Sequence, residues 1–104
     1  MIIRIWTAEA VRAKAEDYRR HFETRVVPHL RAISGFKGAS LLERDEGAQV
    51  AFIALTRWSS MQAIHGFAGP QPEQAIVEPE GRAALSRFDD VVRHYDAAVE
   101  EAAP

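Results

Sequence analysis

The sequence contains no cysteine among its 104 residues. Disulfide bonds, thiolate nucleophiles and cysteine-based metal sites are therefore excluded. No apolar run approaches the roughly 20 residues that a membrane-spanning helix needs. The first ten residues are too short and too interrupted by polar residues for a signal peptide. We therefore expect a cytoplasmic protein with no membrane partner.

The sequence also lacks an excess of charge of one sign. Thirteen Lys and Arg stand against fifteen Asp and Glu, so the net charge is −2. The charges are interspersed, and we expect no nucleic-acid partner because that needs a basic surface. Glycine-rich phosphate loops, nucleophile elbows and flavin or nicotinamide fingerprints are missing. The four histidines show no metal-ligand spacing, so we expect no metal and no other tightly held cofactor: His21, His29, His65 and His94.

The composition is that of one folded domain, with 47% hydrophobic and 27% charged residues. We assign the domain to residues 1–98 and expect the small, acidic tail at 99–104 to fray. Apolar and β-branched runs predict four strands, at residues 1–8, 36–44, 49–58 and 90–97.

Two helices are predicted between these strands. Apolar residues recur every three or four positions over residues 11–33, which indicates a long amphipathic helix. Pro28 is expected to kink or end it, because proline lacks a backbone donor. Ser59, followed three residues later by Gln62, predicts the capped start of a short second helix. Residues 69–81 carry three prolines and are expected to hold only short helical turns.

The order β-α-β-β-α-β predicts the α+β class and a ferredoxin-like split βαβ fold. This fold has a four-stranded antiparallel sheet with both helices on one face. Alternation along the strands assigns Ile2, Trp6, Ile53 and Leu55 to the uncovered face, which is then too apolar for water. A second copy would cover it, so we expect a homodimer packed sheet to sheet.

Four segments resemble the antibiotic biosynthesis monooxygenase-like family: Arg4-Ile5-Trp6, Thr56-Arg57-Trp58-Ser59-Ser60, Ala63-Ile64-His65-Gly66-Phe67-Ala68-Gly69 and Val92-Arg93-His94-Tyr95-Asp96. The resemblance covers nearly the whole chain and implies a dimeric α/β barrel. The family includes cofactor-independent oxygenases of polyketide anthrones, quinol oxygenases, haem-degrading enzymes and small proteins of unknown role. Fold alone does not choose among them.

The resemblance places Trp58 where the polyketide oxygenases have a tryptophan in the substrate pocket. The alternative from the residues alone is a core tryptophan that anchors a strand to a helix. The chain has Ala54 where those enzymes have an asparagine, and Ile64 where they have a tyrosine. Both replacements remove hydrogen-bond donors that would orient a phenolate.

The haem-degrading members of the family use an asparagine, a tryptophan and an axial histidine. The corresponding positions here are Thr7, Phe67 and about Val77, so no imidazole falls at the axial place. We therefore do not expect haem degradation. His65 lies nearby on another part of the second helix, and Trp58 and His65 are our two candidates for a catalytic role.

The last predicted strand carries a polar pattern. Alternation places His94 and Asp96 on one face, and Arg4 and Arg57 have the parity to share it. We assign these four residues to the dimer face as a polar cluster. Our preferred interpretation is an intersubunit network that fixes the dimer register, and catalysis is the alternative.

The helix-facing side of the sheet is expected to hold a flat apolar or aromatic ligand, which reaches it between residues 69–81 and Trp58. We predict a cofactor-independent monooxygenase that oxidises a small quinol, phenol or polyketide-type substrate with dioxygen. The alternative is a ligand-binding or stress-associated dimeric barrel without catalysis. The predicted substrate-binding residues are Thr7, Phe22, Phe52, Thr56, Trp58, Ile64, Phe67 and Tyr95.

Overall fold

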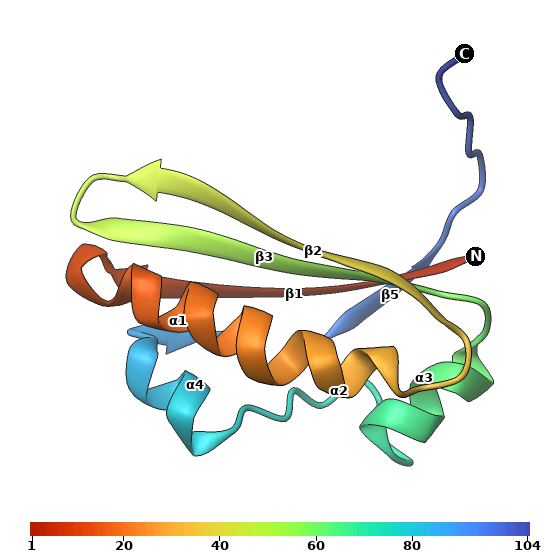
Figure 1. Cartoon of the computed structure of the whole chain (residues 1–104), viewed down its shortest axis with the longest axis horizontal. Helices are drawn as coiled ribbons and strands as arrows, with labels where there is room; N and C mark the ends of the chain where they lie inside the picture. Colours follow the sequence, from red (N-terminus) through yellow and green to blue (C-terminus); the bar gives the residue numbers. More distant parts are fainter.

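The computed structural model describes all 104 residues and has the predicted α+β ferredoxin-like architecture. Its antiparallel sheet has the order β2-β3-β1-β4, and β5 also pairs with β1. Figure 1 shows the helices gathered on one side of this sheet. The strands are β1 (Ile2–Val11), β2 (Phe36–Glu46), β3 (Gln49–Trp58), β4 (Arg87–Phe88) and β5 (Arg93–Asp96).

The predicted last strand, at residues 90–97, is reduced to β5, and the additional short strand β4 lies just before the predicted range; this is a correction. β4 pairs with β1 at Ala8 and Glu9, whereas β5 pairs with β1 over Ile2–Ile5. Between them the chain leaves β1 and turns to the segment that follows the second predicted helix. There Val91 forms a bridge with Gln74. The backbone at 89–92 therefore serves two partners, and the gap between β4 and β5 positions that segment over the sheet.

The first predicted helix is one continuous helical run: η1 (Arg12–Lys14), α1 (Ala15–His21), the π-helical η2 (Phe22–Val26) and α2 (Val27–Arg31). Pro28 does not end the helix as predicted, because the helical run continues to Arg31. In the π-helical turn, the Val27 N–H bonds to the Phe22 carbonyl, five residues back. This change of register places Pro28 in the first turn of α2, where its missing N–H is tolerated.

The second predicted helix is α3 (Met61–Ala68), and its capping residue differs from the prediction. The Ser60 side chain, not that of Ser59, accepts the Ala63 N–H. The Ser59 N–H instead donates to the carbonyl of Gly35, and a Cβ atom at Gly35 would lie 2.5 Å from the Cβ of Ala63. The cap therefore falls one residue later, because Ser59 ties α3 to the turn before β2.

The parity of β1 is the main error of the sequence prediction. In the structure Arg4, Ala8 and Ala10 are buried beneath the helices, and Trp6 lies on the same side. The expected assignment of Trp6 to the uncovered face and of Ile3, Ile5 and Thr7 to the helix face is therefore wrong. The strand continues to Val11, beyond the predicted end at residue 8. Both alternating sets in its first half contain large apolar residues, so the pattern there does not decide the facing.

The core lies between the sheet and the helical run. One buried group surrounds Tyr18 and Phe52, and a second contains Leu30, Trp58 and Ile64. The opposite face of the sheet carries Ile53 and Leu42, both exposed in the single chain. A last short helix, α4 (Pro79–Ala84), packs against α1, and the residues after β5 extend away from the body (Figure 1). None of the helices has the length and apolarity needed to span a membrane.

Candidate functional site

A cavity of about 110 Å³ lies between the sheet and the helical run, and eleven of its fifteen lining residues are hydrophobic. The sheet supplies one wall, the helices the other, and residues 75–78 close it. The lining residues are Arg4, Trp6, Tyr18, His21, Phe22, Val26, Leu30, Ala54, Thr56, Phe67, Ala75, Ile76, Val77, Glu78 and Val92.

The segment between α3 and α4 is fastened to the sheet by backbone hydrogen bonds. The Ala75 N–H donates to the Asp90 carbonyl at 2.9 Å, and the Val92 N–H donates to the Glu73 carbonyl at 2.7 Å. The sequence predicts ligand entry beside residues 69–81, and the structure puts residues 75–78 of that segment against the cavity. Its few fastening bonds make it the part of the wall that opens at least cost.

Arg4 forms the polar end of the cavity. Its Nη1 donates to the Pro72 carbonyl at 2.7 Å and lies 2.8 Å from Nε2 of His94. An arginine only donates, so His94 accepts through Nε2 and is neutral, with its proton on Nδ1. Burial, and then the charge of Arg4, hold the pKa of His94 below its usual value. Burial also lowers the pKa of Arg4 to about 10, against an opposing effect of the Glu73 charge.

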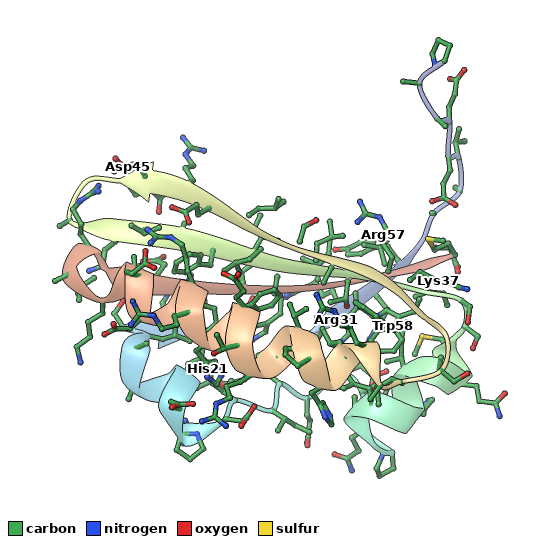
Figure 2. The ribbon with its side chains drawn as sticks, viewed as in Figure 1. His21, Arg31, Lys37, Asp45, Arg57 and Trp58 are labelled. Atoms are coloured by element: carbon green, nitrogen blue, oxygen red, sulfur yellow. The ribbon has the colours of Figure 1, made fainter.

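Tyr18 and His21 form the other end of the cavity. His21 is buried beside α4, and its Nδ1 lies 3.3 Å from a carboxylate oxygen of Glu80 (Figure 2). Because a carboxylate only accepts hydrogen bonds, this contact places a proton on Nδ1 of His21. Burial raises the pKa of Tyr18, so its phenol stays protonated. This end of the cavity therefore offers an imidazole in contact with a carboxylate and a protonated phenol.

Trp6 lies between these two ends. Its ring centroid is 6.3 Å from that of Tyr18. Its indole N–H is already used, because Nε1 donates to the Asp89 carbonyl at 2.7 Å. Trp6 therefore presents an aromatic surface to the cavity and no free donor.

Of the eight predicted substrate-binding residues, the structure brings Phe22, Thr56 and Phe67 to the cavity. Phe52 and Ile64 are packed in the core and do not line it. Thr7 and Tyr95 lie on the other face of the sheet, since Thr7 pairs with Ile53 and Tyr95 with Ile3. The wrong prediction for Thr7 results from the error in the facing of β1. The wrong prediction for Tyr95 has the same origin, because β5 pairs with β1 and its residues face the same sides.

Trp58 is fully buried and lies outside the cavity lining. Its Nε1 donates to the Thr56 hydroxyl at 2.7 Å, and its ring stacks on Phe67 at a centroid distance of 5.6 Å. Trp58 therefore supports two residues that line the cavity. His65, the other catalytic candidate, is exposed near the end of α3, with Nδ1 at 3.0 Å from the Gly69 carbonyl. Neither candidate touches the cavity.

The predicted polar cluster on the dimer face is not formed, because its members lie on different faces. Arg4 and His94 meet on the helix side, as described above. Arg57 lies on the opposite side of the sheet from its neighbour Trp58 (Figure 2), and Asp96 is exposed at the end of β5. β1 and β3 pair with Arg4 opposite Thr56, which fixes Arg4 on the helix side.

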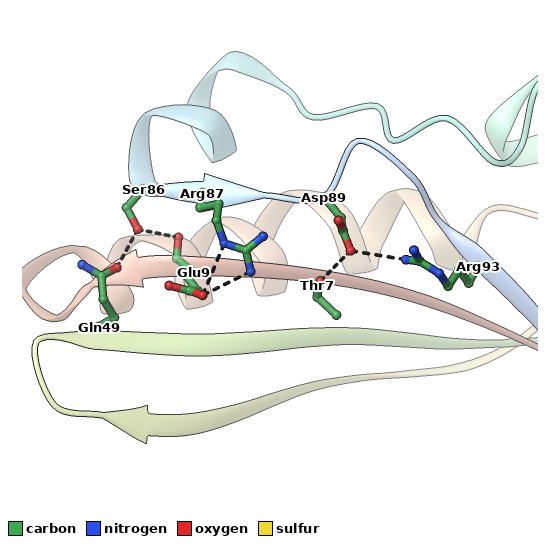
Figure 3. Close-up of polar contacts among 7 residues, drawn as sticks. All are labelled: Thr7, Glu9, Gln49, Ser86, Arg87, Asp89 and Arg93. Atoms are coloured by element: carbon green, nitrogen blue, oxygen red, sulfur yellow. Dashed lines mark hydrogen bonds and ion pairs between the residues drawn. The ribbon is translucent and has the colours of Figure 1, made fainter.

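A different set of polar contacts lies along β1 and β4 (Figure 3). Thr7 donates to Asp89 at 2.8 Å, and Arg93 is 3.4 Å from the same carboxylate. Glu9 pairs with Arg87 at 3.1 Å. These contacts tie the odd-numbered residues of β1 to the strands that follow α4.

Sequence reasoning missed Trp6, Tyr18 and His21 as cavity residues. Tyr18 belongs to the apolar stripe of the predicted helix, and His21 flanks it, so both were interpreted as structural. Their chemical setting depends on α4, because Glu80 reaches His21 from 59 positions away in the sequence. No local pattern announces such a contact.

Several solved structures are similar to this chain. A candidate antibiotic biosynthesis monooxygenase from Bacillus cereus superposes with a TM-score of 0.72 at 15% identity, covering 99% of this chain and 96% of that one. The haem degrader MhuD from Mycobacterium tuberculosis, solved with two haems in its active site, superposes with a TM-score of 0.65 at 19% identity, covering 98% of this chain and 100% of that one. SnoaB from Streptomyces nogalater, a cofactor-independent oxygenase, gives 0.64 at 14% identity and 95% coverage of both chains. No curated protein matches.

These similarities are structural and establish the fold. The family is established by the sequence, because the antibiotic biosynthesis monooxygenase family model matches residues 1–78. That match spans β1 through the segment that closes the cavity. The chain therefore belongs to the antibiotic biosynthesis monooxygenase family.

Proposed function

We propose that this protein is a cofactor-independent monooxygenase that oxidises a small aromatic substrate, a phenol, quinol or polyketide-type ring, with dioxygen. The observation that carries the proposal is the cavity itself. Its walls are mostly apolar and include Trp6 and Phe67, whereas its polar side chains include Arg4 at one end and His21 at the other. Such a site orients a flat ring and excludes water around it.

The proposed reaction needs one base and no external reductant. His21, held by Glu80, accepts the proton of a ring hydroxyl through its free Nε2. The resulting phenolate gives one electron to dioxygen, and the two radicals combine to form a carbon–oxygen bond. The hydroperoxide then loses water, which breaks the oxygen–oxygen bond and leaves a carbonyl on the ring. One dioxygen is consumed, and its second oxygen leaves as water.

The volume of the cavity limits the substrate. An apolar cavity of about 150 Å³ holds one benzene molecule, and the cavity here is about 110 Å³. A single ring is therefore near the limit, and a fused polyketide requires residues 75–78 to move. A haem macrocycle is far larger, and we do not propose haem degradation, although MhuD shares the fold.

Oxygen consumption tests the proposal. The protein should consume dioxygen above the protein-free blank with at least one member of a panel of hydroquinones and anthrones, without added metal or flavin. His21→Gln should lower kcat by about 10²- to 10⁴-fold, the usual loss of a general base. His29→Gln is the matched control, because His29 is exposed on the same helical run and does not line the cavity. No consumption with any substrate would overturn the proposal.

The second candidate function is a ligand-binding protein without catalysis. It is favoured by Ala54 in the cavity wall, a side chain with no hydrogen-bond donor at a place where one would steer a phenolate. Under this alternative an aromatic ligand binds but no dioxygen is consumed. Binding and oxygen uptake measured on the same compounds separate the two candidates.

Tryptophan fluorescence should report the ligand through Trp6. Trp6 lines the cavity and Trp58 does not, so the change in fluorescence should come from Trp6. A bound quinol should quench the unmutated protein and the Trp58→Phe variant, but not Trp6→Phe. Quenching that depends on Trp58 would place the ligand elsewhere.

The proposal includes a homodimer packed through the uncovered face of the sheet. Ile53 and Leu42 are exposed there, and Ile3, Ile5 and Leu55 are half-buried in the single chain. No helix covers this face (Figure 1), and a second copy offers a matching apolar surface.

A further inference from the structure

Arg4 is a buried cation that forms no ion pair. Its residue exposure is 8%, yet none of the seven ion pairs in the structure involves it. The acid that influences it most, Glu73, is exposed and does not reach it as a partner. A buried guanidinium without a carboxylate is costly to a folded protein. This one therefore calls for an explanation beyond stability.

The hydrogen bonds of Arg4 leave donors free. A guanidinium has five N–H groups, and only Nη1 has protein partners, Pro72 and His94. The three N–H groups on Nε and Nη2 have none. Every fully buried side-chain nitrogen or oxygen in the protein has a hydrogen-bond partner. Because Nε and Nη2 of Arg4 have no partner, they are not fully buried and are accessible. Because Arg4 lines the cavity, a ligand bound there could accept hydrogen bonds from these N–H groups.

No carboxylate lies within ion-pair distance of Arg4. His94 is neutral and accepts one of its hydrogen bonds. The ring of Phe67 lies under the guanidinium, with its centroid 5.7 Å from Cζ. Across the strands Arg4 is paired with Thr56, whose side chain is uncharged. The positive charge at this end of the cavity is therefore unmatched by the protein.

We propose that Arg4 binds an ionised oxygen group, a carboxylate or phenolate, on an aromatic ligand whose ring lies beside Trp6 and Phe67. This deepens the proposed function, because it names the class of substrate that the same cavity takes. A guanidinium donates two parallel N–H bonds to such a group, and in a mostly apolar cavity this pairing is strong. A neutral ring of the same size has no equivalent partner there.

Matched pairs of probes test the inference. Benzoate and benzamide have nearly the same shape but differ in charge, and 4-nitrophenolate and 4-nitroanisole provide the phenolate arm. Isothermal titration should show the unmutated protein binding at least one anion tenfold or more tightly than its neutral partner. The arm with the larger ratio identifies the oxygen group. The indole N–H signal of Trp6 in an NMR titration should shift with the preferred anion, which places it in the cavity.

Variants of Arg4 complete the experiment. Arg4→Met should reduce the anion preference to about one, and Arg4→Lys should keep part of it. Arg31→Met is the control, because Arg31 is exposed on α2 and should keep the full preference. If Arg4→Met does not fold, Arg4→Lys and the probe ratios of the unmutated protein decide. Equal affinity for both members of each pair, a preference that survives Arg4→Met, or no binding of any probe would overturn the inference.

The outcome is separable from that of the proposed function. An anion preference that depends on Arg4, without oxygen uptake on any substrate, would support the inference and contradict the monooxygenase. Oxygen uptake that Arg4→Met leaves unchanged would support the monooxygenase and contradict the role of Arg4.

Discussion

Replacement of Ile53 by glutamate should break the proposed dimer. Ile53 lies at the middle of β3 on the face of the sheet that no helix covers, and it is 38% exposed in the single chain. In a monomer the new carboxylate would reach water, and a surface substitution of this kind changes stability by about 0.5 kcal/mol. In a sheet-to-sheet dimer the same carboxylate would be buried without a partner.

The size of the effect follows from symmetry. An unpaired buried charge costs about 3 kcal/mol or more. A two-fold interface uses the same patch on both subunits, so the dimer carries the charge twice. The dimer should therefore lose about 6 kcal/mol, which raises its dissociation constant by about 10⁴-fold.

Sedimentation equilibrium at micromolar concentration measures this change directly. The unmutated protein should sediment as a dimer, and Ile53→Glu should dissociate or unfold. Ile76→Glu introduces the same charge at a residue that is 74% exposed on the helix side, and it should remain dimeric. A monomer for the unmutated protein, or an intact dimer for Ile53→Glu, would refute the reasoning.

Three further predictions concern stability. Gly35→Ala should lower the free energy of unfolding by about 2–5 kcal/mol, because its φ of 93° strains any L-residue and the new Cβ would meet α3. Gly47→Ala, at a φ of 79° but with open space around it, should lower it by about 1–2 kcal/mol. Urea unfolding measures both changes. Thr56→Val should cost about 1–3 kcal/mol in the same assay, because it leaves the indole N–H of Trp58 unpaired, and Thr56→Ser should restore most of it. The pKa of His94 is lowered from 6.5 in the folded protein, so below that pH the unfolded chain binds more protons at His94 than the folded protein does. The free energy of unfolding should therefore fall as the pH drops below about 6.5, and His94→Asn should reduce that loss.

The helices and central strands could be predicted because their patterns are local. Gln49–Trp58 is strand over the predicted range, and the helical stripe from Tyr18 to Leu30 faces the core as its spacing indicates. The errors occur where a distant partner decides. The last strand begins later than predicted because Val91 pairs with Gln74, and the cap moves from Ser59 because that residue bonds to Gly35.

The candidate site was harder to predict than the fold, because its parts come from separated segments. Residues 75–78 are held beside the sheet by backbone hydrogen bonds between Ala75 and Asp90 and between Glu73 and Val92. Trp58 is the most prominent aromatic residue of the family resemblance, yet it lies behind the wall, where it holds Thr56 and Phe67 in place. Composition and spacing identify aromatic residues, but only packing decides which of them face empty space.

The chemistry of the cavity depends on which set of alternating β1 side chains points toward the helices. Thr7 and Glu9 are polar and alternate with Ala8 and Ala10, which are buried. Had the strand been extended through these residues, the alternation would have predicted that the even-numbered positions face the helices. Figure 3 shows what holds the odd positions outward, namely Thr7 bonded to Asp89 and Glu9 to Arg87.

Those outward contacts constrain Trp6 and Arg4, which lie one and three residues before Thr7. Because side chains alternate along a strand, anchoring Thr7 and Glu9 on one face commits Trp6 and Arg4 to the other. A shift of one residue would exchange the guanidinium and the indole for Ile3 and Ile5, and the cavity would lose both its charge and its largest aromatic wall. The surface ion pair of Glu9 contributes little energy of its own, but together with the Thr7 contact it favours the one register that brings Arg4 and Trp6 to the cavity.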